Sequence, residues 1–257
     1  MRNRHSNALR DWRRDSEHWA SSRMRNSLDW ITAAATRPAM VCPVKKPYHL
    51  TGQDTLPSAI SRQVLALPDG EVILYQRVFT GTQRDRLFQE LLDHTPWQQH
   101  TIKLYGRTMA VPRLSAWHGD PGAVYCYSGL RLEPLPWTPV LCEIKAVVEQ
   151  LADTPFNSVL LNLYRHGQDS IGWHSDDEPE LGHHPVIASV SLGAVRRFIL
   201  RHKRLPVRLP LDLDAGSVLL MRGATQQHWQ HQLPKTRKPT NPRINLTFRF
   251  ISWPGLR

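Results

Sequence analysis

The sequence predicts a mainly β, α+β domain: a double-stranded β-helix, or jelly roll, backed by helices. Two segments have the periodicity of amphipathic helices, and short strand-like runs follow them, separated by Gly, Pro and Asp. A length of 257 residues with 40% apolar composition is enough for one sizeable domain plus an extension. Each element of this expectation comes from a local pattern.

The start of the chain is predicted to lie outside the domain. Residues 1–40 are rich in arginine and low in hydrophobicity, and prolines such as Pro43 and Pro57 follow them. The stretch also lacks the uninterrupted apolar run of a signal peptide. We therefore expect residues 1–60 to form a basic, disordered extension with a linker, and residues 61–257 to form the folded domain.

Two segments carry helix signals. Residues 83–94 place leucines and a phenylalanine at helical spacing behind Thr82, a candidate N-cap. In the second segment Thr138 can cap the helix and Pro139 suits its first turn. The apolar stripe of this second helix consists of Val140, Leu141, Ile144, Val147, Val148 and Leu151.

Downstream of the second helix the pattern changes to that of strands. The runs are short, rich in β-branched and aromatic residues, and bounded by turn residues. They are Val159–Tyr164, Val186–Leu192, Arg197–Arg201, Ser217–Met221 and Arg243–Ile251. Many short strands beside two helices are typical of a helix-backed jelly roll.

Charge and cysteine content limit the function classes. There are 33 Lys and Arg against 22 Asp and Glu, a formal net charge of +11, which favours polyanionic partners such as nucleic acid or acidic lipid. No apolar run approaches the ~20 residues that span a bilayer, so no membrane role is expected. Cys42, Cys126 and Cys142 are odd in number and form no C-x-x-C pair. We expect three reduced thiols in a reducing compartment, cytoplasmic or nucleoid/nuclear and not secreted; no protein partner is predicted.

A candidate metal site begins with His174 and Asp176. They are two residues apart, so in an extended segment both side chains leave the same face. One such pair is unsurprising by chance among 13 histidines. His228 and His231 follow a predicted strand, and either could supply a second imidazole. Two histidines and one carboxylate form the facial triad of non-haem iron(II) oxygenases.

The last predicted strand has a polar and an apolar face. The polar face carries Arg243, Asn245, Thr247 and Arg249, and the apolar face Ile244, Leu246, Phe248 and Phe250. A solvent-facing polar side is one interpretation. The alternative is that both arginines face one cavity and grip a small dicarboxylate, since guanidinium groups bind carboxylates bidentately. Their six-residue separation is ~20 Å in an ideal strand, so the side chains must lean together or the strand must bend.

Three motifs together resemble the AlkB family of Fe(II)- and 2-oxoglutarate-dependent dioxygenases, closest to its duplex-DNA-repair branch. The motifs are N-x-Y at Asn162 and Tyr164, H-x-D at His174 and Asp176, and the run from Pro242 to Arg249. The similarity extends from about Val78 to the C-terminus. It implies three iron ligands, His174, Asp176 and His231. It also implies that Arg243 and Tyr164 hold the distal carboxylate of 2-oxoglutarate, while Arg249, Asn162 and Asn245 hold the end that chelates iron.

The resemblance further implies oxidative dealkylation of damaged bases in DNA, of the 1-methyladenine and 3-methylcytosine type. Dioxygen is the second co-substrate, and formaldehyde and succinate are products. Such a base must be flipped out of its stack. Candidate substrate contacts are Tyr125, Tyr127 and Glu178 at the flipped base, Tyr105 as a wedge in the duplex, and Arg201 and Lys203 at phosphates.

Three alternatives remain at this point. An RNA demethylase or RNA-modifying hydroxylase of the same family would carry the same motifs. A non-catalytic nucleic-acid-binding module would be expected to have lost triad or arginine positions, and all of them are intact. A cupin-like metal protein acting on a small molecule would not account for the basic run between Arg196 and Arg208 or for the tyrosine pair.

Overall fold

The structure is a computed structural model, which describes residues 42, 60–104, 107–127 and 130–252. Seven strands form an antiparallel sheet in the order β1 (Ser61–Leu67), β2 (Gly70–Gln76), β13 (Ser217–Arg222), β10 (Ile187–Gly193), β15 (Arg243–Arg249), β8 (Ser158–Tyr164) and β5 (Leu114–Gly119). Four strands form a second sheet in the order β12 (Arg208–Leu213), β11 (Arg196–His202), β14 (Trp229–Leu233) and β9 (Ile171–His174). The predicted jelly-roll class is confirmed.

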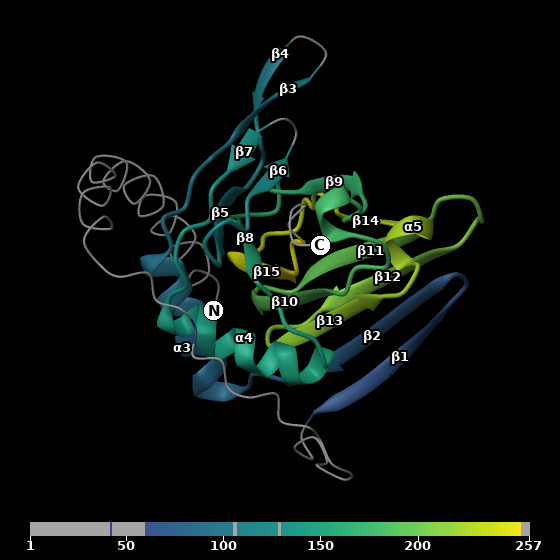
Figure 1. The fold of residues 1–257 in the computed structure, drawn as a ribbon, viewed down its shortest axis with the longest axis horizontal. Coiled ribbons are helices and arrows are strands. Elements are labelled where there is room, and N and C mark those ends of the chain that lie inside the picture. The colour runs from purple at the N-terminus through teal and green to yellow at the C-terminus, as the bar shows by residue number, and fades with distance from the viewer. Residues whose placement is uncertain (1–41, 43–59, 105–106, 128–129, 253–257) are drawn as a thin grey trace, which may run out of the picture. The chain divides into compact units, whose positions relative to one another are not determined.

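Two hairpins and three helices complete the described part of the chain. The hairpins are β3–β4 (Thr101–Leu104 and Arg107–Ala110) and β6–β7 (Tyr125–Tyr127 and Leu130–Leu132). The helices are α3 (Gly81–His94), α4 (Pro139–Ala152) and the short α5 (Thr225–His228), with one 3-10 turn at Pro179–Leu181. The β3–β4 hairpin extends away from the two larger sheets (Figure 1). None of the helices in the described residues is long and apolar enough to cross a membrane.

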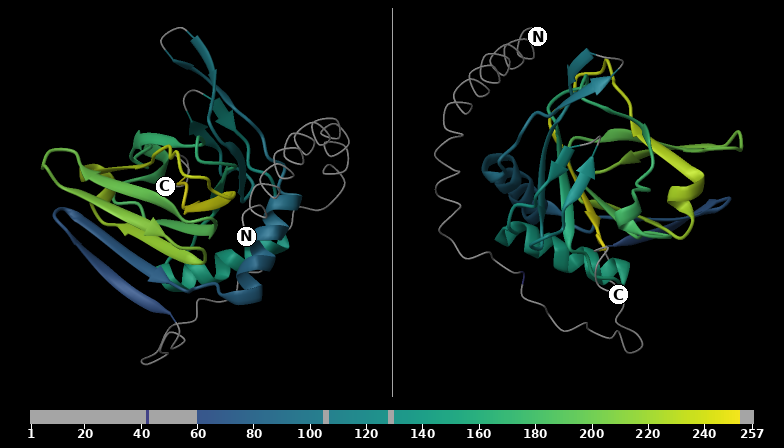
Figure 2. Two further views of the ribbon diagram at one scale, coloured as in Figure 1. Left: turned by 180° about the vertical axis from the view of Figure 1, so that it is seen from behind. Right: turned by 45° about the horizontal axis from the view of Figure 1, so that its top comes forward.

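The seven-stranded sheet lies between two apolar layers. On one face, α3 and α4 bury residues such as Leu87 and Ile144 against Leu246 and Phe248 of β15 (Figures 1 and 2). On the other face, a second cluster that includes Phe198 fills part of the space toward the four-stranded sheet. Because side chains alternate along a strand, the polar face of β15 is turned toward the second sheet. The interior between the sheets therefore receives the arginines of β15.

Both predicted helices are present, but the N-cap was predicted correctly for only one of them. Thr138 caps α4 as predicted, since its hydroxyl accepts a hydrogen bond from the Leu141 backbone N–H at 3.4 Å. The predicted Thr82 cap is wrong, because α3 begins at Gly81 after Thr80, with no side-chain cap bond. All five predicted strands exist, but most of the strands that precede α4 were missed, and so were β9, β12 and β14.

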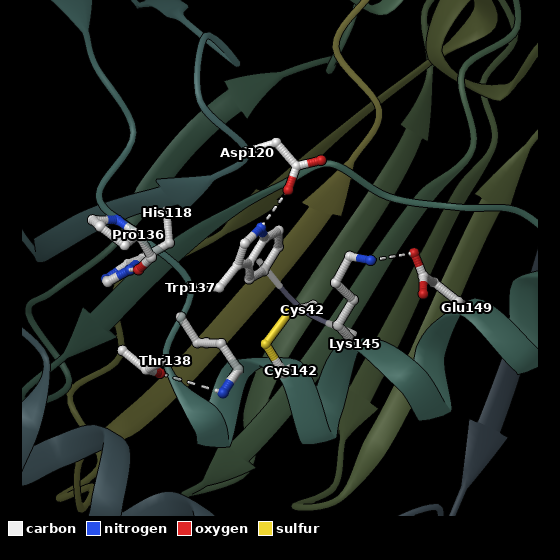
Figure 3. Close-up of a disulfide and its surroundings, with 10 residues drawn as sticks. Cys42, His118, Asp120, Pro136, Trp137, Thr138, Cys142, Lys145 and Glu149 are labelled. Carbon is white, nitrogen blue, oxygen red and sulfur yellow. Dashed lines mark hydrogen bonds and ion pairs between the residues drawn. A yellow bond between two sulfur atoms is a disulfide. The ribbon is translucent and has the colours of Figure 1, made fainter. Parts of the chain in front are cut away.

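The cysteine prediction is wrong for two of the three residues. Cys42 and Cys142 form a disulfide with a Cα–Cα distance of 5.5 Å, which joins position 42 to α4 (Figure 3). Their sequence separation of 100 residues gives no local signal for such a pairing. The bond also removes the cysteine-based reason for expecting a reducing compartment.

Candidate functional site

A cavity between the two sheets collects most of the residues that the sequence singled out. From the large sheet its lining includes Asn162, Tyr164, Ser189, Arg243, Asn245, Thr247 and Arg249. From the small sheet and the segment after β9 it includes His174, Asp176, Glu178, Phe198 and His231. All seven residues of β15 are buried, so its polar face is an internal wall and not a solvent-facing surface.

His174, Asp176 and His231 meet at one end of this cavity. His174 ends β9, Asp176 follows it outside the strand, and His231 lies opposite His174 on β14. One ligand atom from each lies within 4.8 Å of the others. The imidazole centroids are 4.2 Å apart, and Nε2 of His231 is 3.7 Å from Oδ2 of Asp176. Two imidazoles and one carboxylate are thus arranged as a facial triad.

Neighbouring groups orient this triad. Nδ1 of His174 lies 2.8 Å from the Gly172 carbonyl oxygen, which places the proton on Nδ1 and leaves the Nε2 lone pair available for a metal. The backbone N–H of Asp176 donates to Oε1 of buried Gln226 at 2.9 Å. Arg249 donates from Nη2 to Oδ1 of Asp176, so one carboxylate oxygen is fixed by the last strand.

Two residues of the triad, Asp176 and His231, have the protonation states that a divalent metal requires. Burial acts to raise the pKa of Asp176, but the charge of Arg249 and the two imidazoles outweigh burial and lower this pKa to about 2. Burial, reinforced by His174, lowers the pKa of His231 to about 3. At neutral pH Asp176 is therefore a carboxylate and His231 a neutral imidazole, both of which can bind a metal.

Arg243 is a buried cation at the other side of the cavity. It is 2% exposed, and its Nη2 donates to Oγ of Ser191 at 2.8 Å, while its guanidinium carbon lies 5.5 Å from the Tyr164 ring centroid. Among the described residues its buried Nε has no hydrogen-bond partner. Burial lowers the pKa of Arg243 to about 10, so it stays charged at neutral pH. Within the part of the chain that the structure describes, no carboxylate pairs with Arg243, and a buried cation of this kind fits an anionic ligand in the cavity.

The asparagines of the cavity differ in how they are engaged. Asn162 and Asn245 are cross-strand neighbours of β8 and β15. Nδ2 of Asn245 donates to Oγ of Ser189 at 2.8 Å and to the Val190 carbonyl at 3.1 Å, and its Oδ1 accepts from Thr247. Asn245 is therefore held within the wall, and its contact with a co-substrate stays a prediction.

Sequence reasoning missed one arginine of this site. Arg113 precedes β5, is 6% exposed and lines the cavity. Its Nε donates to Oδ1 of Asn162 at 2.8 Å. The only sequence signal was an arginine next to a proline before a strand that itself was not predicted, which gave no reason to place it beside β8.

The candidate substrate contacts lie in different surroundings. Glu178 lines the cavity. The backbone of Tyr125 and Tyr127 forms β6, but their side chains lie outside the described part of the structure, as does the whole of Tyr105. Arg201 packs on the Trp173 ring at 4.1 Å and donates to Oε1 of Gln230. Lys203 is exposed; its Nζ donates to the Gln226 carbonyl at 3.0 Å and lies 3.4 Å from Oδ2 of Asp177.

The basic run around β11 is less available to a nucleic acid than its sequence implies. Arg196 is 4% exposed and donates to three backbone carbonyls, those of His166, Asp169 and Pro234. Arg197 is exposed but pairs with Asp212 across the sheet at 2.8 Å. Arg196 is therefore not available to a phosphate backbone, because its guanidinium is bonded within the fold.

The structure separates His228 from the triad. His228 stacks on His202 with ring centroids 5.9 Å apart, and both lie near Asp69. Nδ1 of His202 accepts the backbone N–H groups of Arg204 and Leu205, at 3.1 and 2.9 Å, so its Nε2 carries the proton. His202 consequently has no free lone pair for a metal, and this second group of potential ligands is not a metal site.

Comparisons with known proteins agree with this geometry. A family model described as the 2OG-Fe(II) oxygenase superfamily matches residues 71–249, from β2 to the end of β15. The human protein named "Alpha-ketoglutarate-dependent dioxygenase alkB homolog 3" is 40% identical over 223 residues, 80% of this chain and 77% of that protein. Human "DNA oxidative demethylase ALKBH2" is 43% identical over 188 residues, 69% of this chain and 72% of that protein.

A solved structure adds a likeness in fold alone. "The structure of OsALKBH1" superposes with a TM-score of 0.53 at 16% identity, and covers 74% of this chain and 100% of that one. With the family match and the curated relatives, the chain belongs to the AlkB family within the 2OG-Fe(II) oxygenase superfamily. The fold class and the family resemblance expected from the sequence are thereby confirmed.

Proposed function

We propose that this protein is an iron(II)- and 2-oxoglutarate-dependent dioxygenase that oxidatively removes alkyl groups from bases of DNA. The observation that carries the proposal is a single cavity with a facial triad at one side and the buried cation Arg243 at the other, where no carboxylate of the described residues pairs with it. A divalent metal would bind the two imidazoles and the carboxylate of the triad, and a carboxylate of the co-substrate would pair with the guanidinium of Arg243.

Different residues of the cavity would bind the metal and the co-substrate. His174, Asp176 and His231 would hold iron(II), and Arg249 would keep the carboxylate of Asp176 in position. Arg243 would take a carboxylate of 2-oxoglutarate, with Tyr164 beside it. When bound, the metal and 2-oxoglutarate supply the oxidising power drawn from dioxygen, and succinate and carbon dioxide are formed.

The substrate class rests on charge and on the relatives' names. The net charge of +11 favours a polyanion, and two relatives are named for DNA oxidative demethylation or for the same dioxygenase class. A 1-methyladenine or 3-methylcytosine base carries its methyl group on the pairing edge, so it must leave the stack to reach the cavity. Hydroxylation of that methyl group would release it as formaldehyde. Glu178 lies at the cavity, where it can contact such a base.

The test is anaerobic reconstitution with iron(II) and 2-oxoglutarate, followed by addition of dioxygen and measurement of formaldehyde. Methylated DNA, the matched methylated RNA and unmethylated DNA serve as substrates. We expect formaldehyde from methylated DNA and none from unmethylated DNA. Release from RNA alone would favour an RNA demethylase, and absence of release with intact metal binding would favour a binding module.

A matched pair of histidine variants tests the site. His231→Ala should abolish both iron binding and formaldehyde release, because the triad loses a ligand. His228→Ala removes a histidine three positions away that contacts His202 instead, so it should retain measurable activity and metal binding. Loss of iron binding in His228→Ala with retention in His231→Ala would contradict the assignment.

A further inference from the structure

We propose that Arg113 is a positioning residue that fixes the side-chain amide of Asn162 with its NH₂ group facing the co-substrate. The inference rests on the proposed function, because it names how the same cavity recognises 2-oxoglutarate. It concerns a residue that lies outside the motifs of β8, β9 and β15 and that contacts one of them from the side.

The hydrogen bond between the two side chains defines which way the amide points. Nε of Arg113 donates to Oδ1 of Asn162 at 2.8 Å, and the two residues are 6% and 3% exposed. An arginine has only donors, whereas an amide has a donor end and an acceptor end. Rotating the amide by half a turn would set its NH₂ against the guanidinium, two donors facing each other in a buried place. Arg113 therefore selects one orientation.

In this orientation the donor end of Asn162 is available to a ligand. Within the described residues Oδ1 of Asn162 has Arg113 as its partner, and Nδ2 has no hydrogen-bond partner. Asn162 lines the same cavity as Arg243 and the triad. An ionised carboxylate only accepts hydrogen bonds, so it binds the NH₂ end of an amide and is repelled by the oxygen end. The selected orientation is thus the one that suits a dicarboxylate.

The segment around Arg113 is itself anchored to the strand that carries His174. The Ser170 backbone N–H donates to the Pro112 carbonyl at 2.9 Å, and Nη1 of Arg113 lies 3.5 Å from the Ser170 carbonyl oxygen. Ser170 immediately precedes β9. Arg113 therefore connects the co-substrate wall on β8 with the start of the metal-bearing strand, and its position is fixed by backbone contacts.

Two substitutions of equal length separate the N–H donor of Arg113 from its charge. In Arg113→Gln, Nε2 stands as far along the side chain as Nε of arginine, so the donor to Asn162 can be kept while the charge is lost. Arg113→Met has similar length and no donor. We expect Arg113→Met to raise the Kd for 2-oxoglutarate ~10-fold or more, the effect of a misdirected hydrogen bond to a charged group, and Arg113→Gln to stay within ~3-fold of the wild type.

The measurement is anaerobic calorimetric titration of 2-oxoglutarate into protein loaded with Mn(II), with Mn(II) affinity and thermal unfolding recorded for each variant. Asn162→Ala should weaken 2-oxoglutarate binding by a similar factor. Adding Arg113→Met to Asn162→Ala should then change Kd by less than ~2-fold, because the two residues act through one contact. Mn(II) affinity should be the same in all variants.

Distinct results overturn the inference and the proposed function. If the wild type does not bind 2-oxoglutarate, the proposed function fails. If the wild type binds it and the Arg113→Gln and Arg113→Met variants lose affinity equally, Arg113 acts by charge and the inference is wrong. Wild-type affinity in Asn162→Ala also overturns it, and this result is obtained even where Arg113→Met does not fold.

Discussion

Replacing Arg243 by methionine is expected to stabilise the ligand-free protein while destroying its affinity for 2-oxoglutarate. Burial lowers the pKa of Arg243 to about 10, and at ~1.4 kcal/mol per pH unit the folded state holds this charge at a cost of ~3 kcal/mol. Methionine loses the hydrogen bond to Ser191 and the contact with the Tyr164 ring, each worth ~1 kcal/mol. The free energy of unfolding should therefore rise by ~1 kcal/mol.

The same substitution removes the group proposed to bind a carboxylate. Loss of a buried charge-assisted contact costs ~3 kcal/mol or more, so Kd for 2-oxoglutarate should rise ~100-fold or more. Arg243→Lys separates charge from geometry, since lysine keeps the charge but lacks the bidentate fork. We expect its Kd to lie between those of the wild type and Arg243→Met, with no gain in stability.

Urea denaturation of the metal-free protein gives the stability, and titration of 2-oxoglutarate into the Mn(II) form gives the affinity. Arg197→Met is the matched control: this arginine is exposed, with 60% side-chain exposure, and pairs with Asp212, so both quantities should stay near wild type. Two results for Arg243→Met would refute the proposal that Arg243 is a buried cation that binds a carboxylate of 2-oxoglutarate. They are a free energy of unfolding that falls by more than ~2 kcal/mol and an unchanged Kd for 2-oxoglutarate.

Three further predictions concern other parts of the chain. Arg196→Met should lower the free energy of unfolding by ~3 kcal/mol in urea, because three backbone carbonyls, one of them buried and two part-buried, lose a charged donor; a loss below ~1 kcal/mol would contradict this. Burial acts to raise the pKa of Asp169, but its pairing with Arg165 outweighs burial and lowers this pKa. The stability that the ionised Asp169 contributes is therefore lost as pH falls below ~4. In Asp169→Asn the urea midpoint of unfolding should depend less on pH in this acid range than in the wild type. Tyr105→Ala should reduce repair of a lesion in duplex DNA far more than in single-stranded DNA if Tyr105 is a wedge, whereas equal losses with a lowered Tm would indicate packing damage.

Local periodicity predicted the parts of the site that lie on regular strands. Alternation along β15 correctly divided its residues into an apolar face, which packs on α3 and α4, and a polar face, which forms the cavity wall. The H-x-D spacing placed His174 beside Asp176, and the structure chose His231 over His228 as the third neighbour. The choice between them depended on the pairing of β14 with β9, which no single segment encodes.

The features that were missed all depend on contacts between distant segments. Arg113 reaches Asn162 across 49 positions, and Cys42 reaches Cys142 across 100. β9 has four residues and β14 five, with polar and aromatic residues mixed, so neither gives a clear strand pattern. The basic run that contains Arg196 does not reveal its burial, because the partners of Arg196 are backbone carbonyl oxygens of distant segments.

Because some arginines are buried, the net charge of the sequence is a poor measure of the positive charge on the surface of the protein. In the described part of the chain four arginines are buried: Arg113, Arg196, Arg243 and Arg249. Three of them line the cavity, while Arg196 joins loops. The +11 of the sequence therefore overstates the charge that a nucleic acid meets at the surface, and part of it makes the interior attractive to a small anion. Attraction to a phosphate backbone must come from exposed groups such as Arg204 and Arg208, whereas the buried arginines act on what enters the cavity.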